Sequence, residues 1–176
     1  MKTSGRSGAK RPRPKREISR SGAKRADITL IVEEKLWRSD RRAMALIRRA
    51  VQEALTKAAR RPRALTILLS GDAHLKELNA LFRGRAKPTN VLSFPAANAK
   101  YLGDVAIAYG VASHEAKSEG KPFAAHAAHL AVHGVLHLLG YDHENEREAK
   151  IMEALEAHVL ASLGIADPYA PIHEAA

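Results

Sequence analysis

Residues 122–143, PFAAHAAHLAVHGVLHLLGYDH, contain the most informative pattern in the chain. Pro122 stands where a proline in the first helical turn is tolerated, and Gly140 is the residue type that commonly ends a helix. Between them, leucine, valine and alanine occupy nearly every side of the expected helix. A helix that is apolar all round belongs in a protein interior. The sequence therefore predicts a buried central helix over about 122–139.

Four histidines share one narrow stripe of this helix when residues are placed about 100° apart: His126, His129, His133 and His137. A stripe of histidines on a buried helix must have partners, because a buried imidazole requires hydrogen bonds. For His126 and His129 the favoured interpretation is a hydrogen-bonded histidine of the core rather than a ligand.

His133, His137 and His143 have the spacing of metal ligands. An i, i+4 pair directs two ring nitrogens at a common point, and Gly140 can turn the chain so that His143 reaches the same point. Three neutral imidazoles form a tetrahedral zinc site with an open fourth position, which is typical of a catalytic metal. The chain has no cysteine, which excludes thiolate zinc sites. Nickel or copper would also accept these ligands.

The string HGVLHLLGYDH, residues 133–143, has the spacing of the metzincin zinc proteases, HExxHxxGxxH, with one exception. Gly134 stands where the protease has its glutamate general base. A peptidase of this kind would keep its metal ligands and lack the group that deprotonates the attacking water. A metzincin-like zinc peptidase without its base is therefore the less favoured alternative.

The remaining sequence predicts a single α+β domain over 27–164, with a four-stranded mixed sheet and helices around the central one. β-forming residues indicate four strands, at 28–32, where apolar residues alternate between two faces, and at 64–69, 90–94 and 102–108, the last two pairing as a hairpin-like ladder. Further helices are expected after a cap at Ser39 or Asp40, between Asp72 and Gly84, and at 111–119 and 145–163. The helix that Asp72 would cap carries four large apolar residues: Leu75, Leu78, Leu81 and Phe82.

The formal net charge of +10 describes the N-terminal segment rather than the domain. Residues 1–25 hold ten lysines and arginines against a single acid, Glu17. We expect a disordered basic tail there, which either holds RNA or another polyanion nearby or has no role. Residues 165–176 are expected to be a C-terminal tail. No apolar run reaches the ~18 residues of a membrane span, so no membrane partner is expected and a cytoplasmic protein is the default.

Several segments resemble the YbeY family of rRNA maturation factors, which are single-strand-specific metallo-endoribonucleases. They follow one another in the family's order: LNALFRGRAKPTNVLSFP at 78–95, LGDVAIA at 102–108, AHLAV at 128–132 and HGVLHLLGYDH at 133–143. The resemblance covers roughly 27–164 and does not include the basic tail.

This resemblance implies a zinc-dependent endoribonuclease of single-stranded RNA, associated with the ribosome and acting in rRNA processing, 16S rRNA 3′ end maturation and ribosome quality control. It implies that His133, His137 and His143 bind the zinc and that Arg83 is needed for activity. Without the resemblance, Arg83 would be read as a solvated cation at a helix end. Arg85 and Lys87, in the basic loop that follows, are candidate RNA contacts.

A ribosome-associated RNA-binding protein with a purely structural metal is the main alternative function. Removal of the metal discriminates the two, because a structural metal is lost together with the fold. No feature of the sequence indicates an oligomeric state.

Overall fold

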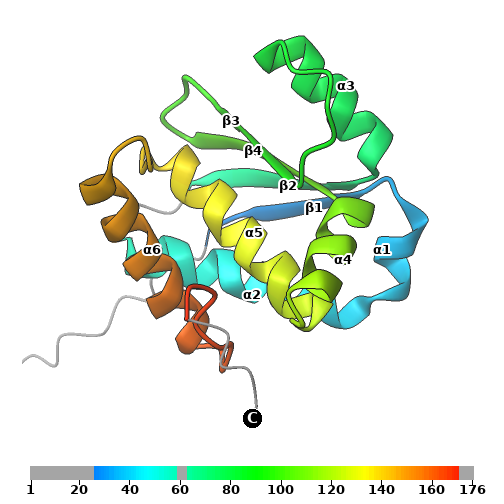
Figure 1. The fold of residues 1–176 in the computed structure, drawn as a ribbon. Coiled ribbons are helices and arrows are strands. Elements are labelled where there is room, and N and C mark those ends of the chain that lie inside the picture. Colours follow the sequence, from blue (N-terminus) through cyan, green and yellow to red (C-terminus); the bar gives the residue numbers. More distant parts are fainter. Residues whose placement is uncertain (1–25, 59–62, 171–176) are drawn as a thin grey trace, which may run out of the picture.

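The computed structural model describes residues 26–58 and 63–170 (Figure 1). The predicted basic tail, 1–25, lies outside them, so its prediction is not tested. In chain order the elements are β1 (Ile28–Val32), α1 (Lys35–Ser39), α2 (Arg41–Lys57), β2 (Ala64–Ser70), α3 (Asp72–Arg83), β3 (Val91–Pro95), β4 (Tyr101–Ala108), α4 (Tyr109–Ser118), α5 (Phe123–Leu138) and α6 (Glu146–Ala161). None of these helices is both long and apolar enough to cross a membrane.

The four strands form one mixed sheet in the order β1-β2-β4-β3. β1, β2 and β4 are parallel, whereas β3 runs antiparallel to β4, as the predicted hairpin-like ladder requires. The predicted α+β class with a four-stranded mixed sheet is confirmed. β3 is an edge strand, which leaves its outer side without a strand neighbour among the described residues.

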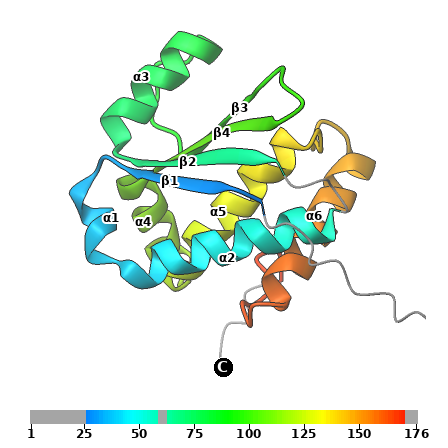
Figure 2. The same ribbon diagram turned by 180° about the vertical axis from the view of Figure 1, so that it is seen from behind.

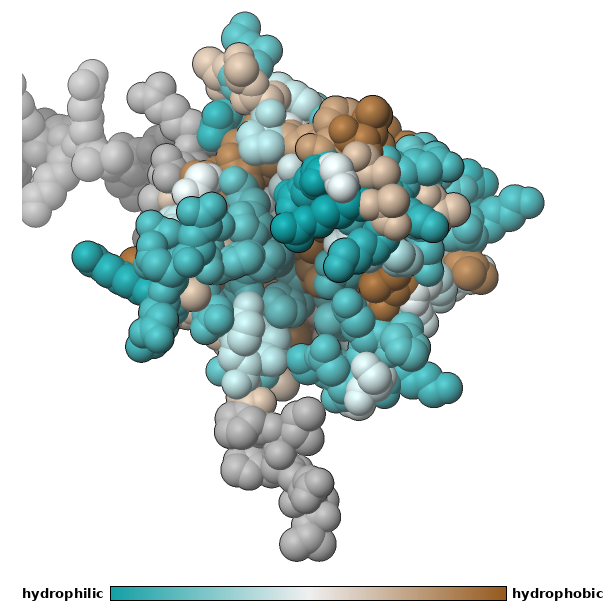
Figure 3. All heavy atoms as spheres, turned by 45° about the horizontal axis from the view of Figure 1, so that its top comes forward, coloured by the Kyte–Doolittle hydropathy of each residue, from teal (hydrophilic) through white to brown (hydrophobic). Residues whose placement is uncertain are grey.

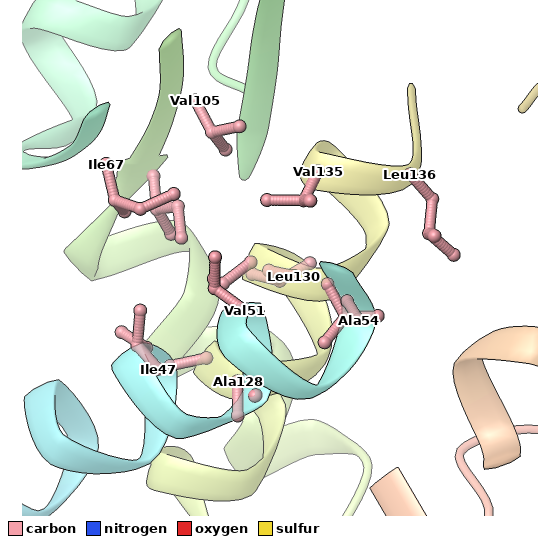
Figure 4. Packing of buried hydrophobic residues seen from close by; sticks show 14 of the residues in the cluster. Ile47, Val51, Ala54, Ile67, Val105, Ala128, Leu130, Val135 and Leu136 are labelled. Carbon is pink, nitrogen blue, oxygen red and sulfur yellow. The ribbon is translucent and has the colours of Figure 1, made fainter. Parts of the chain in front are cut away.

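Side chains alternate between the two faces of the sheet, and the helices divide accordingly. α2, α4, α5 and α6 lie on one side and α3 on the other (Figures 1 and 2). Figure 4 shows side chains from the sheet, α2 and α5 pointing into one shared core: Ile67, Val105, Val51 and Val135. α5 packs against both the sheet and α2, which explains why its sequence is apolar on nearly every side.

The structure corrects the expected cap of α3 and shows which of its apolar residues are buried. Asp72 is its first residue rather than its cap, and the Asp72 carboxylate instead accepts a hydrogen bond from the Val111 N–H in α4 (3.0 Å). Of the four large apolar residues on α3, only Leu75 is buried, while Leu81 and Phe82 are exposed. Gly84 ends the helix as predicted, with a φ of 65° in the left-handed region.

Candidate metal centre

The end of α5 brings three histidines together. The Gly140 N–H donates to the His137 carbonyl and the Tyr141 N–H to the Leu136 carbonyl, both at 3.0 Å. Gly140 has a φ of 89°, so the chain turns back there, as its sequence position predicted. One ring nitrogen from each of His133, His137 and His143 then lies within 4.8 Å of the other two. These residues could hold a metal ion.

The nitrogen positions fit a divalent transition metal. The Nε2 atoms of His133 and His137 are 3.1 Å apart. Two imidazole ligands with zinc–nitrogen bonds of 2.0–2.1 Å and tetrahedral angles would be separated by about 3.3 Å. Burial and the neighbouring His133 and His143 lower the pKa of His137, which favours the neutral imidazole that a metal requires. His143 is exposed, so the cluster is open to solvent on its side.

A buried carboxylate orients the first of these ligands. Glu156, on α6, is 0% exposed, and its Oε1 lies 2.8 Å from Nδ1 of His133. An ionised carboxylate only accepts hydrogen bonds, so Nδ1 of His133 must carry the ring proton. The lone pair of His133 is then on Nε2, the nitrogen that faces His137. This is the carboxylate–histidine arrangement that fixes the tautomer of metal ligands.

Glu156 also accepts hydrogen bonds from two further side chains. Nε2 of His129 lies 2.9 Å from its Oε2, and the Tyr169 hydroxyl donates to the same oxygen. Burial alone would raise the pKa of Glu156, but the hydrogen bonds from His129, His133 and Tyr169 outweigh it and lower the pKa to about 2. Burial and the Glu156 charge raise the pKa of Tyr169. Glu156 is therefore held as a carboxylate at neutral pH.

Sequence reasoning did not identify Glu156, although a signal was present. Met152, Val159 and Leu160 are buried on α6, at spacings of four, three and four residues from Glu156. An acidic residue within such an apolar stripe must find partners in the interior, since an unpaired buried charge is costly. What the sequence could not supply was the identity of those partners, which come from α5 and from residues that follow α6.

Gly134 allows α5 to approach the sheet closely. A Cβ atom at this position would lie 2.5 Å from Cγ1 of Val105 and 3.2 Å from Oγ of Ser93, and the Ser93 hydroxyl donates to the Gly134 carbonyl at 2.9 Å. The position at which metzincins place their general base therefore faces the sheet here. A side chain at 134 would point at the Val105 side chain rather than at the histidine cluster, which argues against the peptidase alternative.

The variant Gly134→Ala tests this packing. We expect a loss of about 1–3 kcal/mol in the free energy of unfolding, because the added methyl group overpacks the contact with Val105. Helix propensity alone predicts the opposite sign, a gain of about 1 kcal/mol. Urea-induced unfolding distinguishes the two, and a stabilised variant would contradict the close approach of α5 to the sheet.

The remaining histidines of α5 have other partners. Nε2 of His126 lies 2.8 Å from a Glu115 oxygen, so both His126 and His129 pair with carboxylates. Both also line a cavity of about 730 Å³ between α2, α5 and α6, which none of the three clustered histidines lines. Neither belongs to the cluster of possible metal ligands.

Asp142 and Tyr141, which precede His143, have structural contacts of their own. The Asp142 carboxylate accepts a hydrogen bond from the His143 N–H (2.8 Å), whereas α6 is capped by Asn145. Asp142 therefore neither caps that helix nor orients a ring. Tyr141 is half-buried and packs against the hydrophobic core.

The three predicted cationic residues are not brought into contact with the histidine cluster. Arg83 is the last residue of α3, and Arg85 and Lys87 lie in the loop that leads to β3. All three are exposed, and none of their side chains forms an ion pair with another described residue. The cluster is on α5 and the turn after it. α5 and α3 lie on opposite sides of the sheet (Figure 1).

Comparison with known proteins gives consistent matches. The family model described as endoribonuclease YbeY matches residues 31–164. Proteins named endoribonuclease YbeY are 48% identical in Rhodopseudomonas palustris, over 80% of this chain and 80% of the relative, and 48% identical in Nitrobacter hamburgensis, over 83% of each. A relative of the same name from Chelativorans is 49% identical over 71% of this chain and 84% of its own length.

The fold also matches a solved structure. The solution structure of a Thermotoga maritima protein aligns with a TM-score of 0.55 and 23% sequence identity, covering 81% of this chain and 99% of the other. At this identity the match concerns the fold alone. It agrees with the arrangement of the sheet and helices described above.

Proposed function

This chain belongs to the YbeY endoribonuclease family, and we propose that it is a metal-dependent endoribonuclease acting on single-stranded RNA. The single observation that carries the proposal is the cluster of His133, His137 and His143, with Glu156 fixing the tautomer of the first. Three neutral imidazoles leave a coordination position open, which a purely structural site does not need.

If His133, His137 and His143 hold a metal ion, it would act as a Lewis acid and would lower the pKa of a bound water from 15.7 toward roughly 7. The chain's own residues prepare for this in two ways. Glu156 accepts a hydrogen bond from the Nδ1–H of His133 and so keeps the lone pair of the neutral ring on Nε2, and His137 is favoured in its neutral form. We also propose that the guanidinium of Arg83, which lies across the sheet from the histidine cluster, binds a phosphate of the RNA away from the cleaved bond and so positions the substrate.

The finer assignments are proposals that family membership supports. We propose that the metal is zinc, since three histidine nitrogens and a tetrahedral site suit it, although nickel and copper share this preference for imidazole. We also propose rRNA as the substrate, in 16S rRNA 3′ end maturation on or near the ribosome in the cytoplasm. The basic residues Arg83, Arg85 and Lys87 support an RNA partner, because their exposed charges complement phosphates.

Metal analysis of freshly purified protein, paired with cleavage of a single-stranded RNA, tests the proposal. We expect about one transition-metal ion per chain, cleavage that a chelator abolishes, and recovery when zinc is returned. Circular dichroism of the chelated protein tests the alternative of a structural metal. Loss of the fold on chelation supports that alternative, whereas an intact, inactive fold supports the nuclease.

Arg83→Glu tests the proposed phosphate contact. Because Arg83 is exposed and forms no ion pair with a described residue, we expect an unchanged melting temperature and metal content. Cleavage should fall by roughly 10- to 100-fold, since a charge-assisted bond to a phosphate of the RNA is replaced by repulsion. Arg41→Glu, an exposed charge reversal on α2, is the matched control. Unchanged cleavage by the Arg83 variant would remove Arg83 from the site.

A further inference from the structure

The last turn of α3 exposes two large apolar side chains. Leu81 is 76% exposed and Phe82 is 61% exposed, the highest values among the large hydrophobic residues described. The ring of Phe82 is not free to move in all directions, because it contacts the ring of Phe94 on β3 with centroids 5.1 Å apart and planes at 66°. Adjacent exposed apolar residues of this kind mark an interaction site more often than single ones do.

The surroundings of this Phe82–Phe94 pair are cationic. Arg83 follows Phe82 directly, and Arg85 and Lys87 lie in the exposed loop that leads to β3. Figure 3 turns this end of the molecule forward and shows hydrophobic, brown residues at the surface beside strongly hydrophilic, teal ones. An exposed aromatic ring bordered by uncompensated positive charge complements an unpaired base flanked by phosphates.

The pair and the histidine cluster lie on the two sides of one edge strand. Phe94 points to the α3 face of the sheet, with Leu92 and Ala106. The preceding residue, Ser93, points to the other face and donates its hydroxyl to the carbonyl of Gly134, next to His133. Because no further strand pairs with β3 among the described residues, an extended chain can pass across this edge from one site to the other.

We propose that Phe82, supported by Phe94, is a stacking platform for one unpaired base of the RNA substrate, with Arg83, Arg85 and Lys87 holding the adjacent phosphates. The inference rests on the proposed function and adds a source of its single-strand preference. In a duplex, both faces of each internal base are already stacked, so only a single strand can offer a free face to Phe82. Every base has such a face, so the platform does not select sequence.

Binding to metal-free protein tests this without any contribution from cleavage. We expect Phe82→Ala to bind a single-stranded oligoribonucleotide roughly 5- to 100-fold more weakly than the wild type, and Phe82→Tyr to restore most of the affinity. An oligonucleotide with abasic sites should bind the wild type and Phe82→Ala about equally. Leu36→Ala, which truncates another exposed leucine (52%) on α1, is the control and should change nothing.

Phe82→Trp gives a direct signal of stacking. The chain has one tryptophan, Trp37, which is fully buried, so a change in emission on RNA binding would come from position 82. We expect quenching by base-bearing RNA and little quenching by the abasic strand.

Two results would overturn the inference while leaving the proposed function intact. In the first, the wild type cleaves RNA, but Phe82→Ala binds RNA as tightly as the wild type does. The second is an equal loss of affinity for base-bearing and abasic strands, which would assign the exposed pair to a protein partner or to local packing. Conversely, a wild type that binds RNA through Phe82 but never cleaves it would support the platform and contradict the nuclease.

Discussion

Replacing His137 with alanine should remove the bound metal and RNA cleavage together. His137 supplies the nitrogen that lies 3.1 Å from Nε2 of His133, so its loss leaves two ligands for an ion that needs three. Changing a group that only orients a ligand costs roughly 10- to 100-fold in metal affinity, and removing the ligand itself should cost more. Cleavage should fall to the chelator background, because the open metal position is the proposed source of activity.

Metal content and cleavage must be measured on the same preparation. His114→Ala provides the control, since His114 is an exposed histidine on α4 outside the cluster. The control should keep full metal content and rate. Full activity in a metal-free His137→Ala protein would end the metal-dependent mechanism.

Glu156→Gln should weaken both metal binding and the fold, although Glu156 is not itself a proposed ligand. The amide is nearly the same size but carries no charge and presents two donors toward His129 and the Tyr169 hydroxyl. We expect roughly 10- to 100-fold weaker metal affinity, because a neutral amide oxygen is a weaker acceptor for the Nδ1–H of His133 than a carboxylate and no longer raises the basicity of its Nε2. The free energy of unfolding of the metal-free protein should fall by about 1–3 kcal/mol, as buried donors lose their acceptor.

The same variant should change how stability depends on pH. A carboxyl group whose pKa is about 2 in the folded protein and near 4.5 when unfolded stabilises the fold fully above pH 4.5. That contribution, about 3 kcal/mol, is lost as the pH falls from about 4.5 toward 2. The free energy of unfolding of the metal-free wild type should therefore fall over this pH range, and that of Glu156→Gln should fall less steeply.

Glu153→Gln, on the same helix, is the matched control for both measurements. Glu153 is only half-buried and forms no ion pair among the described residues, so its substitution should leave metal affinity and acid stability near wild-type values. If both substitutions have the same small effect, Glu156 does not position His133.

Local signals in the sequence were sufficient for most of the elements and for the histidine cluster. Period-two alternation predicted the first strand and short runs of β-forming residues predicted the other three, while a helix apolar on every side predicted its own burial. The spacing of His133, His137 and His143, with Gly140 before the last, predicted the cluster because a helix repeat and a glycine turn are local geometry. These features depend on residues within a few positions of one another.

Only the tertiary structure decided which distant groups meet. It brought Glu156 and Tyr169 to the rings of α5, placed Gly134 against Val105, and left Leu81 and Phe82 exposed to solvent. Helical period identifies residues that share a face but does not say which neighbour covers that face. That depends on how α3, α5 and α6 are placed around the sheet, and hydrophobic burial sets this placement through the chain as a whole.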